Sequence, residues 1–222
     1  MSQPFRGRFE YDRAELWADG IIHVLGTFLG LAGVAALVAV FVPASTSSDL
    51  APVLVYSVGL LAVLVISAIY NMWPVSPVKW WLRRCDHSAI YVLIAGTYTP
   101  FLVHMSDGPT AQGLIVLIWA ASLVGIVLKI ALPGRFDRLS IGLYLAIGWS
   151  GVVLWDRVIL LPSTTLWLLA GGALFYTGGV AFHLLDKLSF QNAIWHACVL
   201  AAAVLHYSAV VSLITTPSIA PV

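Results

Sequence analysis

The positions of the charged residues constrain this chain more than any other feature of its sequence. Its 11 basic and 10 acidic residues leave seven charge-free runs, each at least 17 residues long. About 20 predominantly apolar residues span the roughly 30 Å hydrocarbon core of a bilayer. The runs therefore predict seven membrane-spanning helices, near residues 21–42, 51–73, 88–106, 112–132, 139–155, 163–184 and 194–215.

The composition excludes several classes of protein. Hydrophobic residues make up 60% of the 222-residue chain and charged residues 9%, against about 45–50% and about 25% in a soluble domain. A net charge of +1 leaves no electrostatic field for nucleic-acid binding. A transmembrane β-barrel would need alternating segments of about ten residues, whereas the stretch from Leu114 to Leu128 is apolar on every side. The expected fold class is all-α, a seven-transmembrane helix bundle.

The basic residues predict the orientation of this bundle. With the spans above, ten of the 11 basic residues fall on one side of the membrane, and only Arg157 falls on the other. By the positive-inside rule, the N-terminus is cytoplasmic and the C-terminus lies outside. We expect a cytoplasmic arm over residues 1–19 and one transmembrane domain over residues 20–222, in a multi-pass protein of the inner (plasma) membrane.

Polar residues from five helices gather at the cytoplasmic end of the predicted bundle. Ionisable groups in or near hydrocarbon are costly and usually functional, and those four residues apart share one helix face. The sequence therefore predicts a functional cavity at this end. At 1.5 Å rise per residue, His206 lies about 15 Å beyond His196, near the midplane. The polar residues at the cytoplasmic end are Glu15, Asp19, His23, Ser67, Tyr70, Asn71, Asp86, His87, Ser88, His183, Asn192 and His196.

The segment from Asp86 to Phe101, DHSAIYVLIAGTYTPF, is similar to the signature of the hemolysin III proteins. These proteins are the bacterial branch of the progestin and adipoQ receptor (PAQR) superfamily. The resemblance covers nearly the whole chain, from Glu15 to Val210. Three further motifs carry it, namely Glu15-xxx-Asp19-xxx-His23, Ser67-xx-Tyr70-Asn71, and Asn192-xxx-His196 followed by His206.

The resemblance implies seven helices, an internal N-terminus and a zinc ion near the cytoplasmic leaflet. In the family, one histidine of the second helix and two of the seventh hold the metal. An aspartate and a serine close to its water correspond here to Asp86 and Ser67. Related membrane hydrolases such as alkaline ceramidases share this arrangement, which implies hydrolysis of an amide bond in a lipid. Three protein ligands and one water form the open pattern of catalytic zinc.

This sequence departs from the family pattern at the metal itself. Asn71 and Asn192 stand where the family has histidines, and only His196 remains of the three ligands. In one interpretation, His23, Asp86 and His196 hold the ion, and the two asparagines form hydrogen bonds around it. In the other, no metal binds, and the same residues form a network that fixes the bundle or relays protons.

We expect a hemolysin III/PAQR-type membrane protein that senses or modifies lipid, with membrane lipids and a lipid-like ligand as partners. If it is an enzyme, the catalytic candidates are Asp86 and Ser67. An alternative is a channel, transporter or cytolysin-like pore with His206 as a relay. A retinal protein is excluded because the last helix holds no lysine for a Schiff base. The expected cavity-lining residues are Asp19, Tyr70, Asn71, Asn192 and His206.

Overall fold

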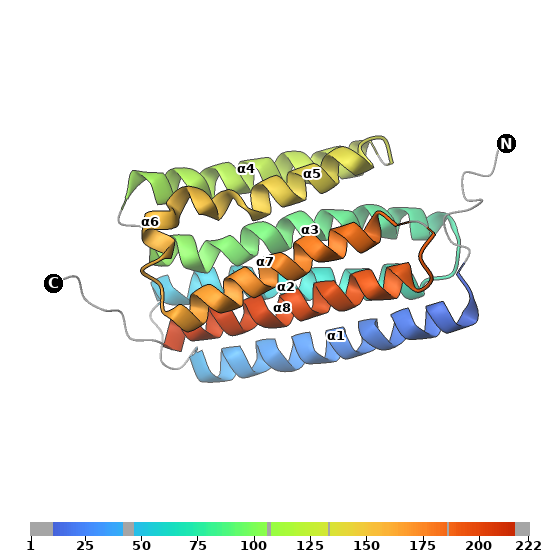
Figure 1. The fold of residues 1–222 in the computed structure, drawn as a ribbon, viewed down its shortest axis with the longest axis horizontal. Coiled ribbons are helices and arrows are strands. Elements are labelled where there is room, and N and C mark those ends of the chain that lie inside the picture. Colours follow the sequence, from blue (N-terminus) through green and yellow to red (C-terminus); the bar gives the residue numbers. More distant parts are fainter. Residues whose placement is uncertain (1–10, 42–46, 106–107, 133, 186, 216–222) are drawn as a thin grey trace.

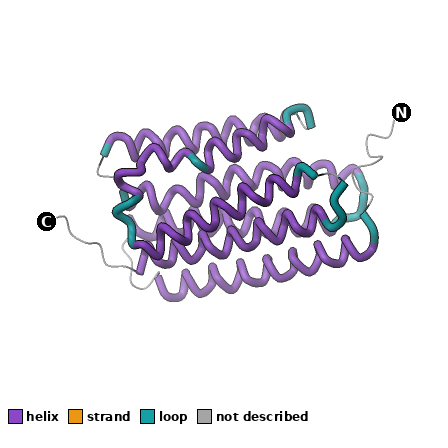
Figure 2. The backbone as a smooth tube through the Cα atoms, viewed as in Figure 1, coloured by secondary structure: helices purple, strands orange, loops and turns teal. Residues whose placement is uncertain are grey.

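The computed structural model describes residues 11–41, 47–105, 108–132, 134–185 and 187–215. Within these ranges the chain forms helices joined by short turns, and no strand occurs there (Figure 2). The all-helical prediction is therefore confirmed. Residues 1–10 of the expected arm, with Arg6 and Arg8, lie outside the described residues. The helices are α1 (Arg13–Phe41), α2 (Ser47–Met72), α3 (Pro77–His104), α4 (Pro109–Ala131), α5 (Asp137–Gly148), the 3-10 helix η2 (Ser150–Leu154), α6 (Trp155–Val158), α7 (Ser163–His183) and α8 (Gln191–Thr215).

The helix α3 lies at the centre of the bundle, between the α4–α5 pair and the layer that holds α2, α7 and α8 (Figure 1). Six segments of the described chain are long and apolar enough to cross a membrane: α1, α2, α4, α7, α8 and the stretch from α5 to α6. α3 is 28 residues long but is more polar than these. Twelve of its residues are buried, among them Lys79, Asp86, Ser88 and Thr99, so these polar side chains face other helices and need not meet lipid.

The first helix begins earlier than the sequence pattern predicts. The predicted span begins near residue 21, whereas α1 begins at Arg13, so the expected boundary between residues 19 and 20 falls inside this helix. The backbone N–H of Glu15 donates to Asp12 Oδ1 at 2.7 Å, and the N–H of Asp12 donates to Glu15 Oε2 at 3.1 Å. This reciprocal capping box satisfies two amides that would otherwise lack partners at the helix start.

The fifth predicted span, 139–155, is interrupted. α5 ends at Gly148, and the 3-10 helix η2 follows over Ser150–Leu154. The hydroxyl of Tyr98, on α3, donates to the carbonyl of Gly148 at 2.6 Å and accepts from the N–H of Gly151 at 2.9 Å. One phenol from a neighbouring helix therefore satisfies two backbone groups at the break, which allows a non-α segment at membrane depth.

A partly buried cluster of charges joins α3, α4 and α5 where α4 ends. Asp137 accepts from Arg83 Nη2 at 2.8 Å and from Lys129 Nζ at 2.9 Å. Burial works to raise the pKa of Asp137, but the hydrogen bonds from Lys129 and Arg83 outweigh it and hold the pKa well below its ordinary value. The carboxylate therefore stays charged and keeps the three helix ends together.

Two glycines of α4 offer a matched test of packing in this bundle. Gly125 faces the ring of the fully buried Tyr91, and a Cβ added there would collide with that ring. We expect Gly125→Ala to lower the free energy of unfolding by about 1–3 kcal/mol through overpacking. Chemical unfolding in detergent measures this loss.

The control is Gly113→Ala on the same helix, where an added Cβ meets nothing within 4 Å. It should raise stability by up to about 1 kcal/mol, because alanine favours a helix more than glycine does. Equal shifts from the two substitutions would contradict this account of the α3–α4 interface.

Candidate functional site

Polar residues of α1, α2, α3 and α8 meet at the end of the bundle where α1, α3 and α8 begin and α2 ends (Figure 1). Asp19 and His23 lie one turn apart on α1. Asn71 is the residue before the last of α2, and His196 lies in the second turn of α8. The four-residue spacings in the sequence therefore place these side chains on helix faces that meet in the folded chain.

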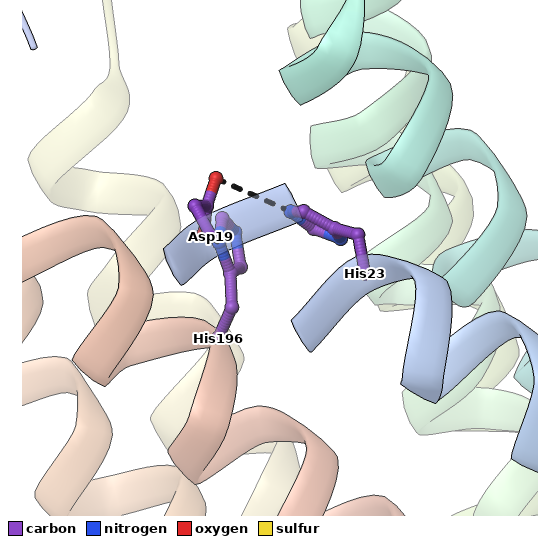
Figure 3. A group of neighbouring side chains, drawn as sticks. All are labelled: Asp19, His23 and His196. Carbon is purple, nitrogen blue, oxygen red and sulfur yellow. Dashed lines mark hydrogen bonds and ion pairs between the residues drawn. The ribbon is translucent and has the colours of Figure 1, made fainter. Parts of the chain in front are cut away.

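The carboxylate of Asp19 is the centre of the group, and Asp19 is only 7% exposed. Its Oδ1 lies 2.6 Å from His196 Nδ1, and its Oδ2 accepts from Asn192 Nδ2 at 2.9 Å. His23 Nε2 lies 3.5 Å from the same Oδ2. Figure 3 shows both imidazoles beside this carboxylate. A buried carboxylate is tolerated when it is paired and hydrogen-bonded, and Asp19 meets both conditions.

Asp19, His23 and His196 also form a candidate metal group, whose ligand atoms all lie within 4.8 Å of one another. The two imidazole rings are 4.3 Å apart between centroids. His23 Nε2 is buried and makes no hydrogen bond. Two imidazoles and one carboxylate are a known ligand set for catalytic zinc, which keeps its fourth position for water. The donor set and the unsatisfied nitrogen therefore fit a metal such as zinc.

The two asparagines that stand where the sequence resemblance leads us to expect histidines contact each other. Asn192 Nδ2 lies 3.3 Å from Asn71 Oδ1, and Asn71 Nδ2 donates to the carbonyl of Ser67 at 3.0 Å and to its hydroxyl at 3.3 Å. Amide groups are weaker zinc ligands than imidazole. In this structure Asn192 donates a hydrogen bond to the carboxylate of Asp19, and Asn71 contacts Asn192.

Asp86, predicted from the sequence as a metal ligand, lies beside the metal group and is not part of it. This residue of α3 is 8% exposed, interacts with the hydroxyl of Ser67 and lies in the electrostatic field of His23 and His196. Asp19 supplies the third ligand atom of the group instead. The four-residue spacing of Asp19 and His23 was the sequence signal for this pairing.

A cavity of about 30 Å³ adjoins the two histidines. This volume holds one or two water molecules, since a single water needs about 10–15 Å³. One wall is polar, from His23, Ser67 and His196. The other walls are apolar and come from Ile22, Gly26, Val63, Leu64, Val199 and Leu200.

None of the five residues expected to line the cavity is among its lining residues. Asp19, Asn71 and Asn192 belong to the hydrogen-bonded group next to it, and the other two lie elsewhere. Tyr70 is buried on α2, where the ammonium of Lys79 lies 5.4 Å from its ring centroid. His206 Nε2 lies 3.2 Å from the carbonyl of Leu169, and its ring packs against Tyr176. Neither residue lines the cavity beside the metal group, and His206 belongs to the α7–α8 interface.

Sequence reasoning missed the role of Lys79. Its ammonium is buried and donates to the carbonyls of Asn71 at 3.1 Å and Trp73 at 2.7 Å, at the end of α2. A cation at this position satisfies exposed carbonyls and matches the negative end of the helix dipole. A lysine shortly after a predicted helix end was the available signal. Lys79 thereby fixes the backbone that carries Asn71.

Comparisons with known proteins agree with these motifs. The model of the family described as "Haemolysin-III related" matches residues 14–207. The Hemolysin-3 homolog of Bacillus subtilis is 34% identical over 184 residues, which cover 82% of this chain and 86% of that protein. Hemolysin-3 of Bacillus cereus is 32% identical over 194 residues, which cover 86% and 87%.

The similarity extends to mammals. The monocyte to macrophage differentiation factor of Homo sapiens is 31% identical over 163 residues, which cover 70% of this chain and 67% of that protein. No solved structure shows a significant match to the chain. The family match along most of the chain, together with six apolar helices, identifies it as a multi-pass membrane protein of the hemolysin III/PAQR family.

Proposed function

We propose that this chain is a seven-span inner-membrane protein that hydrolyses a lipid amide at a metal site formed by Asp19, His23 and His196. The observation that carries the proposal is the meeting of two imidazoles and a carboxylate beside a cavity with one polar wall and several apolar walls. The cavity has room for the attacking water beside the two imidazoles, and its apolar walls suit a group that the hydrocarbon of a lipid approaches from the membrane.

The arrangement of the helix ends supports seven spans with a cytoplasmic N-terminus. The start of α1 and the end of α8 lie at opposite ends of the bundle (Figure 1), as an odd number of crossings requires. α3 supplies the seventh span, because the polar residues along its middle, Asp86, Ser88 and Thr99, are buried. The basic residues Lys79, Arg83, Arg84, Lys129 and Arg135 lie near the turns at the site end, which we place in the cytoplasm. The boundary between residues 19 and 20 then separates a cytoplasmic arm, which includes the first two turns of α1, from the transmembrane domain.

Topology reporters distinguish seven spans from six. We expect alkaline phosphatase fused after Val222 to be active, because the enzyme folds only outside the cytoplasm. The same reporter inserted after Val75, between α2 and α3, should be inactive. Activity at neither position would place both on the cytoplasmic side and would refute the seven-span proposal.

The residues of the site divide into ligands and groups that act on the substrate. Asp19, His23 and His196 would hold the ion, which when bound would supply Lewis acidity and an activated water. Asn192 orients the carboxylate of Asp19 through its 2.9 Å hydrogen bond. Asp86, beside the hydroxyl of Ser67, would act as the general base and take the proton of the attacking water.

Elemental analysis of protein purified without chelator tests the metal site. We expect about one zinc per chain, as in other three-ligand catalytic sites. His23→Ala and His196→Ala should each lose the metal, because each removes one of three ligands. The matched control is His104→Ala, at the far end of α3, which should retain it. Less than about a tenth of an equivalent in the wild-type protein would refute the metal site.

The hydrogen bonds of Asp19 favour a second candidate, a lipid sensor without metal. His196 and Asn192 already satisfy the carboxylate in the structure. A sensor would bind lipid beside the same group of residues without cleaving it. Lipid binding that persists in zinc-free protein, with no product formed, would support this candidate over the hydrolase.

A fluorescent ceramide analogue in liposomes tests the hydrolase directly. We expect Asp86→Asn to lower the hydrolysis rate by about 10²–10⁴-fold, because an amide cannot act as a general base. The zinc content should stay unchanged, since Asp86 is not one of the three ligands. Asp156→Asn, at an exposed position of α6, is the control and should keep full activity.

Two outcomes would contradict the hydrolase. An unchanged rate in Asp86→Asn would remove the proposed base. An ion flux through liposomes containing the wild-type protein, with no cleavage of the analogue, would favour the channel or pore alternative.

A further inference from the structure

The carboxylate of Glu15 contacts two helices at once. Its Oε2 accepts from the N–H of Asp12 at 3.1 Å, which caps α1. Its Oε1 accepts from the N–H of Phe190 at 2.8 Å, although the two residues are 175 positions apart in the chain. Phe190 directly precedes Gln191, the first residue of α8. One side chain therefore joins the start of α1 to the start of α8.

The backbone of Phe190 is constrained from both sides. Its φ of 58° is the only positive φ of a non-glycine residue in the described part of the chain. Such a conformation is strained for a residue with a Cβ and persists only where surrounding contacts hold it. The carbonyl of Phe190 accepts from the N–H of Ile194 at 2.9 Å, so Phe190 caps α8. The hydrogen bond to Glu15 therefore holds the residue that sets where α8 begins.

This contact is the first of a series that runs along α1 and α8. Glu15 bonds to Phe190, and one turn further along α1, Asp19 bonds to Asn192 and His196. One more turn brings the ring of His23 against His196. A slip of one residue would move α8 by about 1.5 Å along α1, which is more than half of a metal–ligand bond. The first contact therefore lies in line with the site contacts and links the same two helices.

We infer that Glu15 is a positioning residue, which holds α8 in register with α1 and thereby aligns Asn192 and His196 with Asp19 and His23. The inference goes beyond the proposed function, because this alignment holds whatever the site binds. The opposing explanation is that Glu15 only caps α1. Capping needs one carboxylate oxygen, whereas the structure engages both.

Hydrogen exchange of the full-length protein in nanodiscs, read by mass spectrometry, separates these explanations. We expect Glu15→Ala to speed exchange about tenfold in the segment 188–194, because the Phe190 amide loses a charged acceptor. Asp12→Ala is the matched control. It removes the other half of the capping box, so it should speed exchange at the start of α1 alone.

Glu15→Gln provides a conservative variant in case Glu15→Ala fails to fold. Its side chain keeps one acceptor oxygen, and its NH2 cannot accept where the second oxygen of Glu15 does, so protection of segment 188–194 should fall between wild type and Glu15→Ala. Unchanged exchange of segment 188–194 in both Glu15 variants, or the same exchange pattern in Asp12→Ala, would overturn the inference.

A Co²⁺ titration followed by absorbance provides a second measurement. We expect about tenfold weaker binding in Glu15→Ala, as for other residues that orient metal ligands, and unchanged binding in Asp12→Ala. A wild-type protein that binds no metal would refute the proposed metal site alone. The exchange experiment would still decide the role of Glu15.

Discussion

The buried carboxylate of Asp19 is the interaction on which the site end of the bundle depends. A charge at the edge of hydrocarbon must be compensated, because its solvation by water is lost. The compensation comes from His23 on α1 and from Asn192 and His196 on α8. These partners can reach one carboxylate only when α1 and α8 lie side by side in a defined register. The electrostatic requirement of one side chain therefore determines how two helices dock.

The same carboxylate supplies one of the three ligand atoms of the candidate metal group, although two histidines expected from the sequence resemblance are missing. Asn71 and Asn192 stand on the second and last helices where the sequence resemblance leads us to expect histidines, while Asp19 supplies a charge on the first. Amides form hydrogen bonds well but bind zinc poorly, and here they bond to each other and to Asp19. The candidate metal group is consequently centred between α1 and α8, with α2 in a supporting role.

The charge-free runs predicted the helices well, and the four-residue spacings predicted which polar side chains share a face. They could not predict whether Asp19 or Asp86 would join the histidines, because that depends on how each helix is rotated in the bundle. A helix that is apolar on every side carries no signal for its rotation. The break after Gly148 was equally out of reach, since the hydroxyl that stabilises it comes from Tyr98 on another helix. α3 is more polar than the other long helices, and its position at the centre of the bundle buries several of these polar residues.

The peripheral position of α1 gives its polar contacts a second role. Lipid is as apolar as leucine, so burial of apolar surface does not drive helices together in a membrane, and association depends on packing and hydrogen bonds. α1 exposes many large side chains, including Trp17, Val24 and Phe28. Its hydrogen bonds to α8 come from Glu15 and Asp19 at the site end and from the carbonyl of Gly33, which accepts from Tyr207 at 2.7 Å further along. The residues that form the candidate metal group are therefore also among those that attach α1 to the bundle, and the chemistry of the site is coupled to the docking of this helix.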